Sequence, residues 1–300
     1  ESWYEKLQRW NDALATYERK YEEDPTNIDN TLGRIRCLNA LGEWDSAAAL
    51  ARQAWKDAHD SSANVKKRIA HEAAKASWNV SDWKFLEELV HSPAGGAGSI
   101  QSTFFKALLC VHSGAFREAQ EYITQARDAV DVPLAALVAE SYDRAYEYMI
   151  TVQQLSELEE VIQYKKELEA ESAARAAGIE EEYSQLAPRK PEDGPLPPSR
   201  LKRHDIIKRS WQQRLEGCQR DVDVWQRLLG VRSLVIPAEE NLATWLKFVK
   251  VCQQSGRFKM SHQVLASLMG GGAYSPRVRA RPRLVAPGSS LMIIDWCCVE

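Results

Sequence analysis

The sequence lacks the features of a membrane protein or a metal protein. Its apolar runs all fall short of the roughly 18 residues that a bilayer-crossing helix needs, and no signal peptide is visible. Its six cysteines show no CxxC spacing and its six histidines are scattered singly, which argues against a zinc site. We therefore predict no metal site and no membrane span, with free, mostly buried thiols in a reducing compartment.

Motifs for phosphoryl transfer are missing as well. A protein kinase needs an Asp-Phe-Gly, a catalytic-loop Asp with a downstream Asn, and a Lys for the phosphates, and the sequence contains no such set. Arg203-His204-Asp205 is superficially similar to a catalytic loop, but no suitably spaced Asn follows, so we interpret it as the charged start of a helix. Glu159-Glu160 is interpreted as a solvated pair on a polar helix face. We expect no catalytic residue in this chain and no ATP turnover.

Nucleic-acid binding is also disfavoured. Such binding needs a continuous basic face interleaved with exposed aromatic side chains. The ten tryptophans fall mostly on apolar helical stripes, and arginines cluster densely only between Arg277 and Arg283. The composition, with 44% apolar and 27% charged residues, is instead ordinary for a soluble globular protein.

What the sequence does contain is a repeat. Five times a short turn precedes a bulky apolar residue that begins a helix, at steps of 33 to 42 residues, and a sixth copy follows later. This spacing is typical of helical-hairpin arrays of the tetratricopeptide or HEAT type. The prediction is an all-α fold, an α-solenoid of such hairpins, with helices that begin at Trp10, Trp44, Trp83, Phe116, Leu158 and Phe258.

The turns of this repeat carry their own signals. Glycines stand where the end of a helix favours a residue with positive φ, at Gly42, Gly114 and Gly256. Asn79-Val80-Ser81 replaces the glycine in the third copy, where Ser81 is the predicted N-cap. Small residues recur three positions after the aromatic one and would let paired helices approach closely, at Ala13, Ala47 and Ala119.

Composition divides the chain into four parts. Residues 1–165 and 201–269 are predicted to form helical hairpins. Residues 166–200 begin as a charged, alanine-rich helix former and become rich in proline, so we predict a largely disordered insertion. Residues 270–300 have no repeat and a basic Pro/Arg bias, which indicates a disordered tail or sequence from outside the family. The first residue is Glu1 rather than methionine, so we expect a fragment or a processed product.

Specific strings add a family resemblance to this pattern. ESWYEKLQRWNDALATYERK, LGRIRCLNALGEW, QLSELEEVIQYK, WQQRLEGCQRDVDVWQRLL and TWLKFVKVCQQSGR resemble the FAT domain of the target of rapamycin (TOR) kinases, which are phosphatidylinositol-3-kinase-related serine/threonine kinases. The resemblance covers residues 1–165 and 201–269. It implies a C-shaped α-solenoid that clamps the kinase domain, where ATP and Mg would act.

The resemblance also implies partners and sites. The partners would be the kinase domain of the same protein and Raptor- or Rictor-type subunits, in the cytoplasm and also in the nucleus or on endomembranes. Arg220 and Lys247 fall on basic positions at which the family contacts inositol hexakisphosphate, whereas Gln254 replaces a family lysine. No other cofactor is expected. Residues at the hairpin contacts would tune access to the kinase, namely Trp10, Cys37, Gly42, Trp44 and Trp83.

Two functions remain open at this point. The first is a non-catalytic scaffold of a TOR-like kinase in growth and nutrient signalling, which restrains the kinase domain and offers protein-interaction surfaces. The alternative is a stand-alone helical-repeat adaptor with no kinase attached.

Overall fold

The computed structural model describes residues 2–58, 62–93, 99–176 and 203–269, and within these ranges every regular element is a helix. The prediction of an all-α fold is therefore confirmed. The elements are α1 (Ser2–Lys6), α2 (Trp10–Glu23), α3 (Ile28–Leu41), α4 (Trp44–Asp57), α5 (Ala63–Asn79), α6 (Trp83–His91), α7 (Ile100–Ser113), α8 (Phe116–Glu140), α9 (Tyr142–Ala176), α10 (Arg203–Gly217), α11 (Val222–Arg232), the 3-10 helix η4 (Ala238–Asn241), α12 (Leu242–Gln254) and α13 (Phe258–Leu268).

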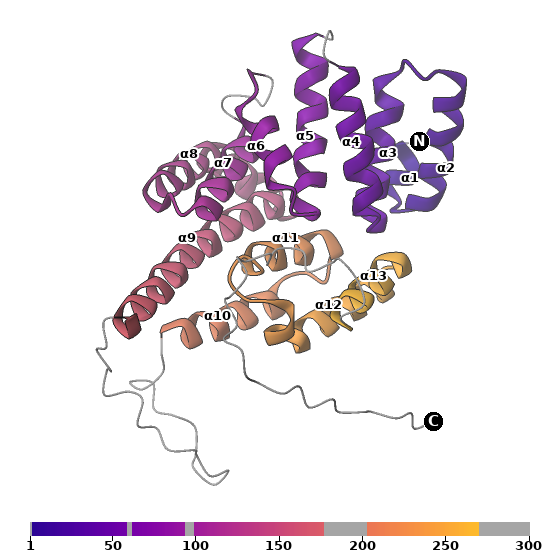
Figure 1. Ribbon diagram of the computed structural model, residues 1–300. Coiled ribbons are helices and arrows are strands. Elements are labelled where there is room, and N and C mark those ends of the chain that lie inside the picture. The colour runs from indigo at the N-terminus through magenta and orange to yellow at the C-terminus, as the bar shows by residue number, and fades with distance from the viewer. Residues whose placement is uncertain (1, 59–61, 94–98, 177–202, 270–300) are drawn as a thin grey trace, which may run out of the picture.

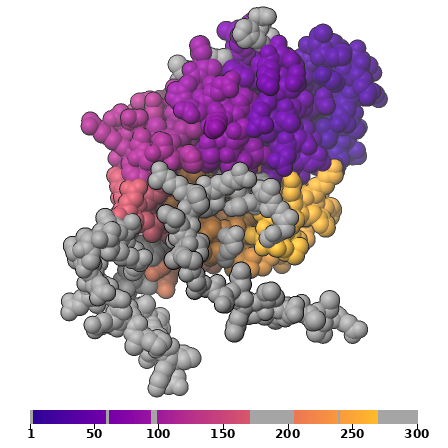
Figure 2. Space-filling model, in the orientation of Figure 1, coloured from indigo at the N-terminus to yellow at the C-terminus, as the bar shows by residue number. Residues whose placement is uncertain are grey.

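These helices form two layers (Figure 1). Helices α1 to α8 stack as successive hairpins in the upper layer, and the long helix α9 descends from it at one end. Helices α10 to α13 form the lower layer, which runs back beneath α5, α4 and α3. Figure 2 shows the consequence on the surface, where the yellow C-terminal helices lie against the N-terminal ones.

Most of the predicted helix starts are confirmed. Helices begin at Trp10, Trp44, Trp83, Phe116 and Phe258. Leu158 is the exception, because it lies in the interior of α9 and no turn precedes it. The sequence from Tyr142 to Ala176 contains no glycine or proline, so nothing in it ends the helix before or at Leu158.

The three turn glycines adopt the predicted left-handed conformation. Their φ angles are +86° at Gly42, +85° at Gly114 and +72° at Gly256. The prediction for Ser81 is wrong. Ser81 itself takes the left-handed position with φ +58°, and Asp82 caps α6 by accepting a hydrogen bond of 3.3 Å from the Phe85 amide.

The interior follows the predicted stripes. The alanines three positions after the aromatic residues are completely buried at Ala13, Ala47 and Ala119, as expected for helices that approach closely. Most of the described tryptophans are buried or half-buried, but Trp3 is 73% exposed. The four described cysteines are free, two of them buried and two half-buried, while Cys297 and Cys298 lie outside the described residues.

Two predicted boundaries fall partly outside what the structure describes. Helix α9 continues through Ala176, so the first part of the predicted insertion is helical. Residues 177–202 and 270–300 lie outside the described residues, and the predictions for them stay predictions. Among the helices that the structure does describe, none combines the length and the apolarity that crossing a membrane would require.

Candidate functional site: the contacts that close the helical array

The turn between α3 and α4 rests directly on α13. A Cβ atom placed on Gly42 would lie 3.0 Å from both the Cα and the Cβ of Met260, which is too close for relaxed packing. The next residue, Glu43, forms an ion pair of 2.8 Å with Lys259. Position 42 therefore requires glycine for two reasons. Its backbone has a positive φ, which glycine adopts without strain, and α13 of the lower layer lies too close to leave room for a side chain.

Arg257 forms the centre of a second contact between the layers. Its side chain is only 2% exposed and makes two hydrogen bonds to Asp223, of 2.7 and 2.9 Å. Its guanidinium also lies 5.5 Å from the ring centroid of Trp10, within the range of a cation–π interaction. A residue in the turn between α12 and α13 thus contacts α2, near the other end of the described chain.

The five residues predicted to lie at hairpin contacts divide into two groups. Trp10, Gly42 and Trp44 all meet the lower layer, since Trp44 belongs to the same apolar cluster as Met260. Cys37 does not, because it is enclosed with Ala13 and Tyr17 inside the upper layer, where burial raises the pKa of its thiol to about 12. The ring of Trp83 stacks on that of His112 in α7, with 4.0 Å between the ring centroids.

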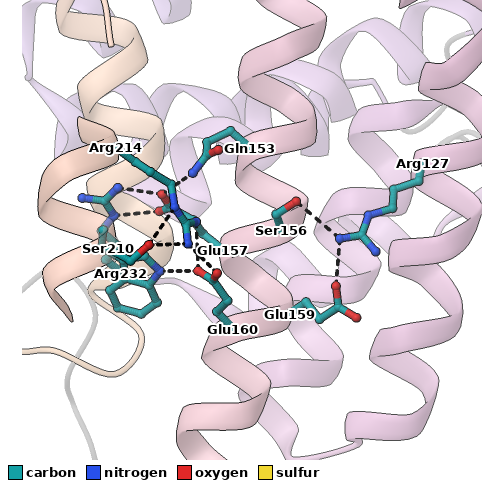
Figure 3. A network of polar contacts seen from close by, with 10 residues as sticks. Arg127, Gln153, Ser156, Glu157, Glu159, Glu160, Ser210, Arg214 and Arg232 are labelled. Atoms are coloured by element: carbon teal, nitrogen blue, oxygen red, sulfur yellow. Dashed lines mark hydrogen bonds and ion pairs between the residues drawn. The ribbon is translucent and has the colours of Figure 1, made fainter. Parts of the chain in front are cut away.

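A polar network joins helix α9 to the helices on both sides of it (Figure 3). At its centre Glu157 accepts two hydrogen bonds from Arg232 of α11, of 2.6 and 2.7 Å. Both side chains are removed from water, with 0% of Glu157 and 3% of Arg232 exposed. Gln153 donates a further hydrogen bond of 2.7 Å to the same carboxylate. This pair holds α11 against α9.

The neighbouring carboxylates bind one helix each. Glu160 accepts hydrogen bonds from Arg214, the shortest of 2.5 Å, and from the indole of Trp211, also at 2.5 Å. Glu159 accepts one of 2.8 Å from Arg127 on the other side, as Figure 3 shows. The prediction that Glu159 and Glu160 are solvated agrees with the structure for Glu159, whose side chain is 41% exposed, but less well for Glu160, which is 30% exposed and held by α10.

Sequence reasoning missed the most buried pair of this network. Glu157 interrupts an apolar stretch that contains Leu155, Leu158 and Val161, all fully buried. A carboxylate in such a place needs a buried cation, and Arg232 stands among the apolar residues of α11 in a similar way. Two opposite charges inside apolar patterns were the available signal, but the sequence alone does not say that they meet.

The two predicted contacts for inositol hexakisphosphate lie on the surface of the lower layer. Arg220 is exposed in the turn between α10 and α11, and no ion pair to it is found among the described residues. Lys247 of α12 makes an ion pair of 2.6 Å with Glu216, near the end of α10. Gln254 is exposed at the end of α12. The ligand itself stays a prediction.

Comparison with known families gives two matches along the chain. Residues 70–288 match the FAT domain family. Residues 6–70 match the tetratricopeptide repeat family, in the part of the chain that contains the turns before Trp10 and Trp44. The two matches together agree with a helical-repeat array.

Individual relatives are similar over nearly the whole chain. The serine/threonine-protein kinase TOR of Oryza sativa subsp. japonica is 38% identical over 287 residues, and that of Arabidopsis thaliana is 39% identical over 288. Serine/threonine-protein kinase TOR2 of Saccharomyces cerevisiae is 37% identical over 269 residues. Each alignment covers 90% of this chain and 10% of the relative, so the chain spans about a tenth of the length of these relatives.

Proposed function

Because the chain belongs to the FAT domain family and is similar to this part of the TOR serine/threonine kinases, we propose that it clamps and restrains the kinase domain of a TOR-like protein. The observation that carries the proposal is the closure of the helical array upon itself. Gly42 and Glu43 of the upper layer touch Met260 and Lys259 of the lower layer, although more than 200 residues separate them.

Closure matters because an open array would be a poor clamp. In a helical solenoid each hairpin contacts only its neighbours, so small rotations between hairpins add up along the stack. A contact between distant hairpins removes this freedom, since the angle at every step between them is then limited. The buried ion pair of Glu157 and Arg232 further limits the rotation between hairpins, because it joins α9 to α11 where the chain turns back. Such a closed unit can transmit force to a kinase domain.

The partners follow from the same proposal. They are the kinase domain of the same protein, where ATP and Mg would act, and accessory subunits of the Raptor or Rictor type. The site of action is the cytoplasm, together with the nucleus and endomembranes, and the process is growth and nutrient signalling. The stand-alone adaptor is the second candidate, and it differs in having no kinase whose activity responds to the closure.

Two glycines provide a matched test in the full-length protein. Gly42 and Gly114 have nearly the same φ, +86° and +85°, so valine strains the backbone similarly at both. Only at Gly42 would the new side chain meet the lower layer, because a Cβ on Gly114 meets nothing within 4 Å. Gly42→Val should change kinase activity per folded molecule several-fold more than Gly114→Val, with the ATP KM unchanged. Equal activities in the two folded variants would contradict the restraint.

We also propose, from the resemblance, that Arg220 and Lys247 contact inositol hexakisphosphate in the complete domain. The exposure of Arg220 supports this, since its five N–H donors are available to a phosphate. Lys247 would have to exchange Glu216 for the ligand. Arg220→Ala should weaken binding of the compound in calorimetry, whereas Lys250→Ala, at an exposed lysine of the same helix as Lys247, serves as the control. Equal affinities would argue against these contacts.

A further inference from the structure

A cleft of about 440 Å³ opens between helices α3, α5, α6 and α7 of the upper layer. The buried part of its lining is mostly apolar and comes from all four helices, namely Leu32, Ala70, Ala74, Leu89, Val90 and Phe105. Charges beside such an apolar lining interact more strongly than charges in open water, because the local dielectric constant is lower. The exposed side chains of the cleft therefore decide what it can bind.

The exposed part of the lining is basic. Lys67, Arg68 and His71 all belong to α5, and steps of three and four residues place them on one face of that helix. Lys67 is exposed, and the side chains of Arg68 and His71 are 43% and 47% exposed. A ligand that enters the cleft from solvent can therefore reach all three.

The cleft contains little negative charge of its own. Among its described lining residues only Glu72 is acidic, and its carboxylate already lies 3.5 Å from Lys75 and 3.9 Å from His71. The N-terminal turn of α7 also lines the cleft, with Ser99 and Gln101, and the partial positive charge of a helix start favours the same sign of ligand. The balance of the lining favours an anion.

Two of the cations are available to such an anion. Lys67 forms no ion pair within the described parts of the chain. Arg68 pairs with Asp29 of α3, but both side chains are exposed, and exposed pairs of this kind contribute little. Arg36, the other arginine of the lining, is held by Glu5 at 2.9 Å and is not needed for the argument.

His71 distinguishes one negative charge from two. Burial and the charge of Lys75 lower the pKa of His71, although Glu72 works to raise it, so its ring is mostly neutral at pH 7. A ligand with one negative charge would be matched by Lys67 alone. A ligand with two would also engage Arg68 and would favour a proton on His71. The set of three therefore suits a doubly charged oxyanion.

We propose that this cleft binds a phosphate monoester, a group that carries close to two negative charges at pH 7. Its oxygens would accept charge-assisted hydrogen bonds from Lys67, Arg68 and the protonated ring of His71. The cleft belongs to the upper layer, apart from Arg220 and Lys247 of the lower one. The binding does not depend on the proposed kinase restraint and can be tested without a kinase.

Two probes of the same shape test the charge on the 300-residue chain. Phenyl phosphate carries two negative charges at pH 7.5, whereas phenyl sulfate carries one. We expect phenyl phosphate to bind at least fivefold more tightly in calorimetry. In histidine-ring NMR it should raise the pKa of His71, because a bound anion stabilises the protonated ring. His112 is the internal control, since burial lowers its pKa as well and it lies outside the cleft lining.

A third probe separates the two sources of such a group. It is a short alanine peptide with a central phosphotyrosine, whose side chain carries the same phenyl phosphate. Affinity equal to that of phenyl phosphate would indicate a phosphorylated side chain of a partner protein. Weaker binding would indicate a free phosphate monoester. Either result supports the phosphate site itself.

Variants then test the cations. Lys67→Gln should weaken phenyl phosphate about tenfold, and Lys66→Gln is the matched control, because Lys66 is the preceding residue of α5 and lies outside the cleft lining. Asp29→Asn should tighten binding several-fold, since it releases Arg68 from its partner. A gain of affinity cannot come from misfolding, so this variant keeps the test decisive if Lys67→Gln does not fold.

Three results would overturn the proposal. Equal affinities for phenyl phosphate and phenyl sulfate would mean that the cleft does not recognise the second charge. An unmoved pKa of His71 at saturating phenyl phosphate would place the anion elsewhere. Equal losses in Lys66→Gln and Lys67→Gln would mean that the net charge of α5, and not this cleft, attracts the ligand.

Discussion

The ion pair between Glu157 and Arg232 allows a quantitative test of how the layers are joined. Replacing Arg232 with methionine removes the guanidinium and keeps a long apolar side chain of similar reach. The carboxylate of Glu157, which is 0% exposed, would then be buried without a counter-charge. Within the described part of the chain, the amide of Gln153 alone would still donate a hydrogen bond to it.

The expected loss is large on the scale of a folded domain. Removing one partner of a buried ion pair costs about 3–5 kcal/mol, because the remaining charge is left uncompensated. The whole free energy of unfolding of a domain is roughly 5–15 kcal/mol. The double variant Glu157→Leu with Arg232→Met leaves no buried charge at this pair, and such replacements are often neutral or stabilising. The double variant should therefore recover most of the free energy of unfolding that Arg232→Met alone loses.

Urea unfolding followed by circular dichroism measures these differences, and α9 provides a matched control. The pair of Arg127 and Glu159 lies on the same helix at 2.8 Å, but its side chains are 35% and 41% exposed. Arg127→Met should cost about 1 kcal/mol or less, since exposed pairs contribute little. If Arg232→Met were no more costly than Arg127→Met, or if the double variant were as unstable as Arg232→Met, the reasoning would be refuted.

Three smaller predictions concern single residues. Ser81→Gly should raise the free energy of unfolding by about 1 kcal/mol, because glycine adopts the left-handed position without a steric penalty; an unchanged urea midpoint would contradict this. Burial works to raise the pKa of Glu5, but hydrogen bonds and the charge of Arg36 outweigh it and lower that pKa. The stability that Glu5 contributes is therefore present above its ordinary pKa and lost as pH falls through the lowered value, and Arg36→Met should remove this loss in acid unfolding curves. The buried thiol of Cys37, with a pKa of about 12, should react with iodoacetamide far more slowly than half-buried Cys218, and equal rates by mass spectrometry would argue against the packing.

Local features of the fold could be predicted from the sequence because their causes lie within a few residues. A turn glycine such as Gly42 and the aromatic residue that follows it specify where one helix ends and the next begins. The same reasoning was wrong at Leu158, where an apolar residue similar to a repeat start lies in uninterrupted helix. It was also wrong at Ser81, because a serine can occupy a left-handed position when the neighbouring Asp82 supplies the cap.

Long-range contacts were decided only by the tertiary structure. The repeat period and the family strings determined that this chain is an α-solenoid of the FAT type, since both depend on order along the chain. They did not determine that Glu157 meets Arg232 or that Gly42 meets Met260. Those contacts depend on how far the lower layer turns back beneath the upper one. That angle is a sum of small rotations between hairpins, and no single hairpin sequence specifies it.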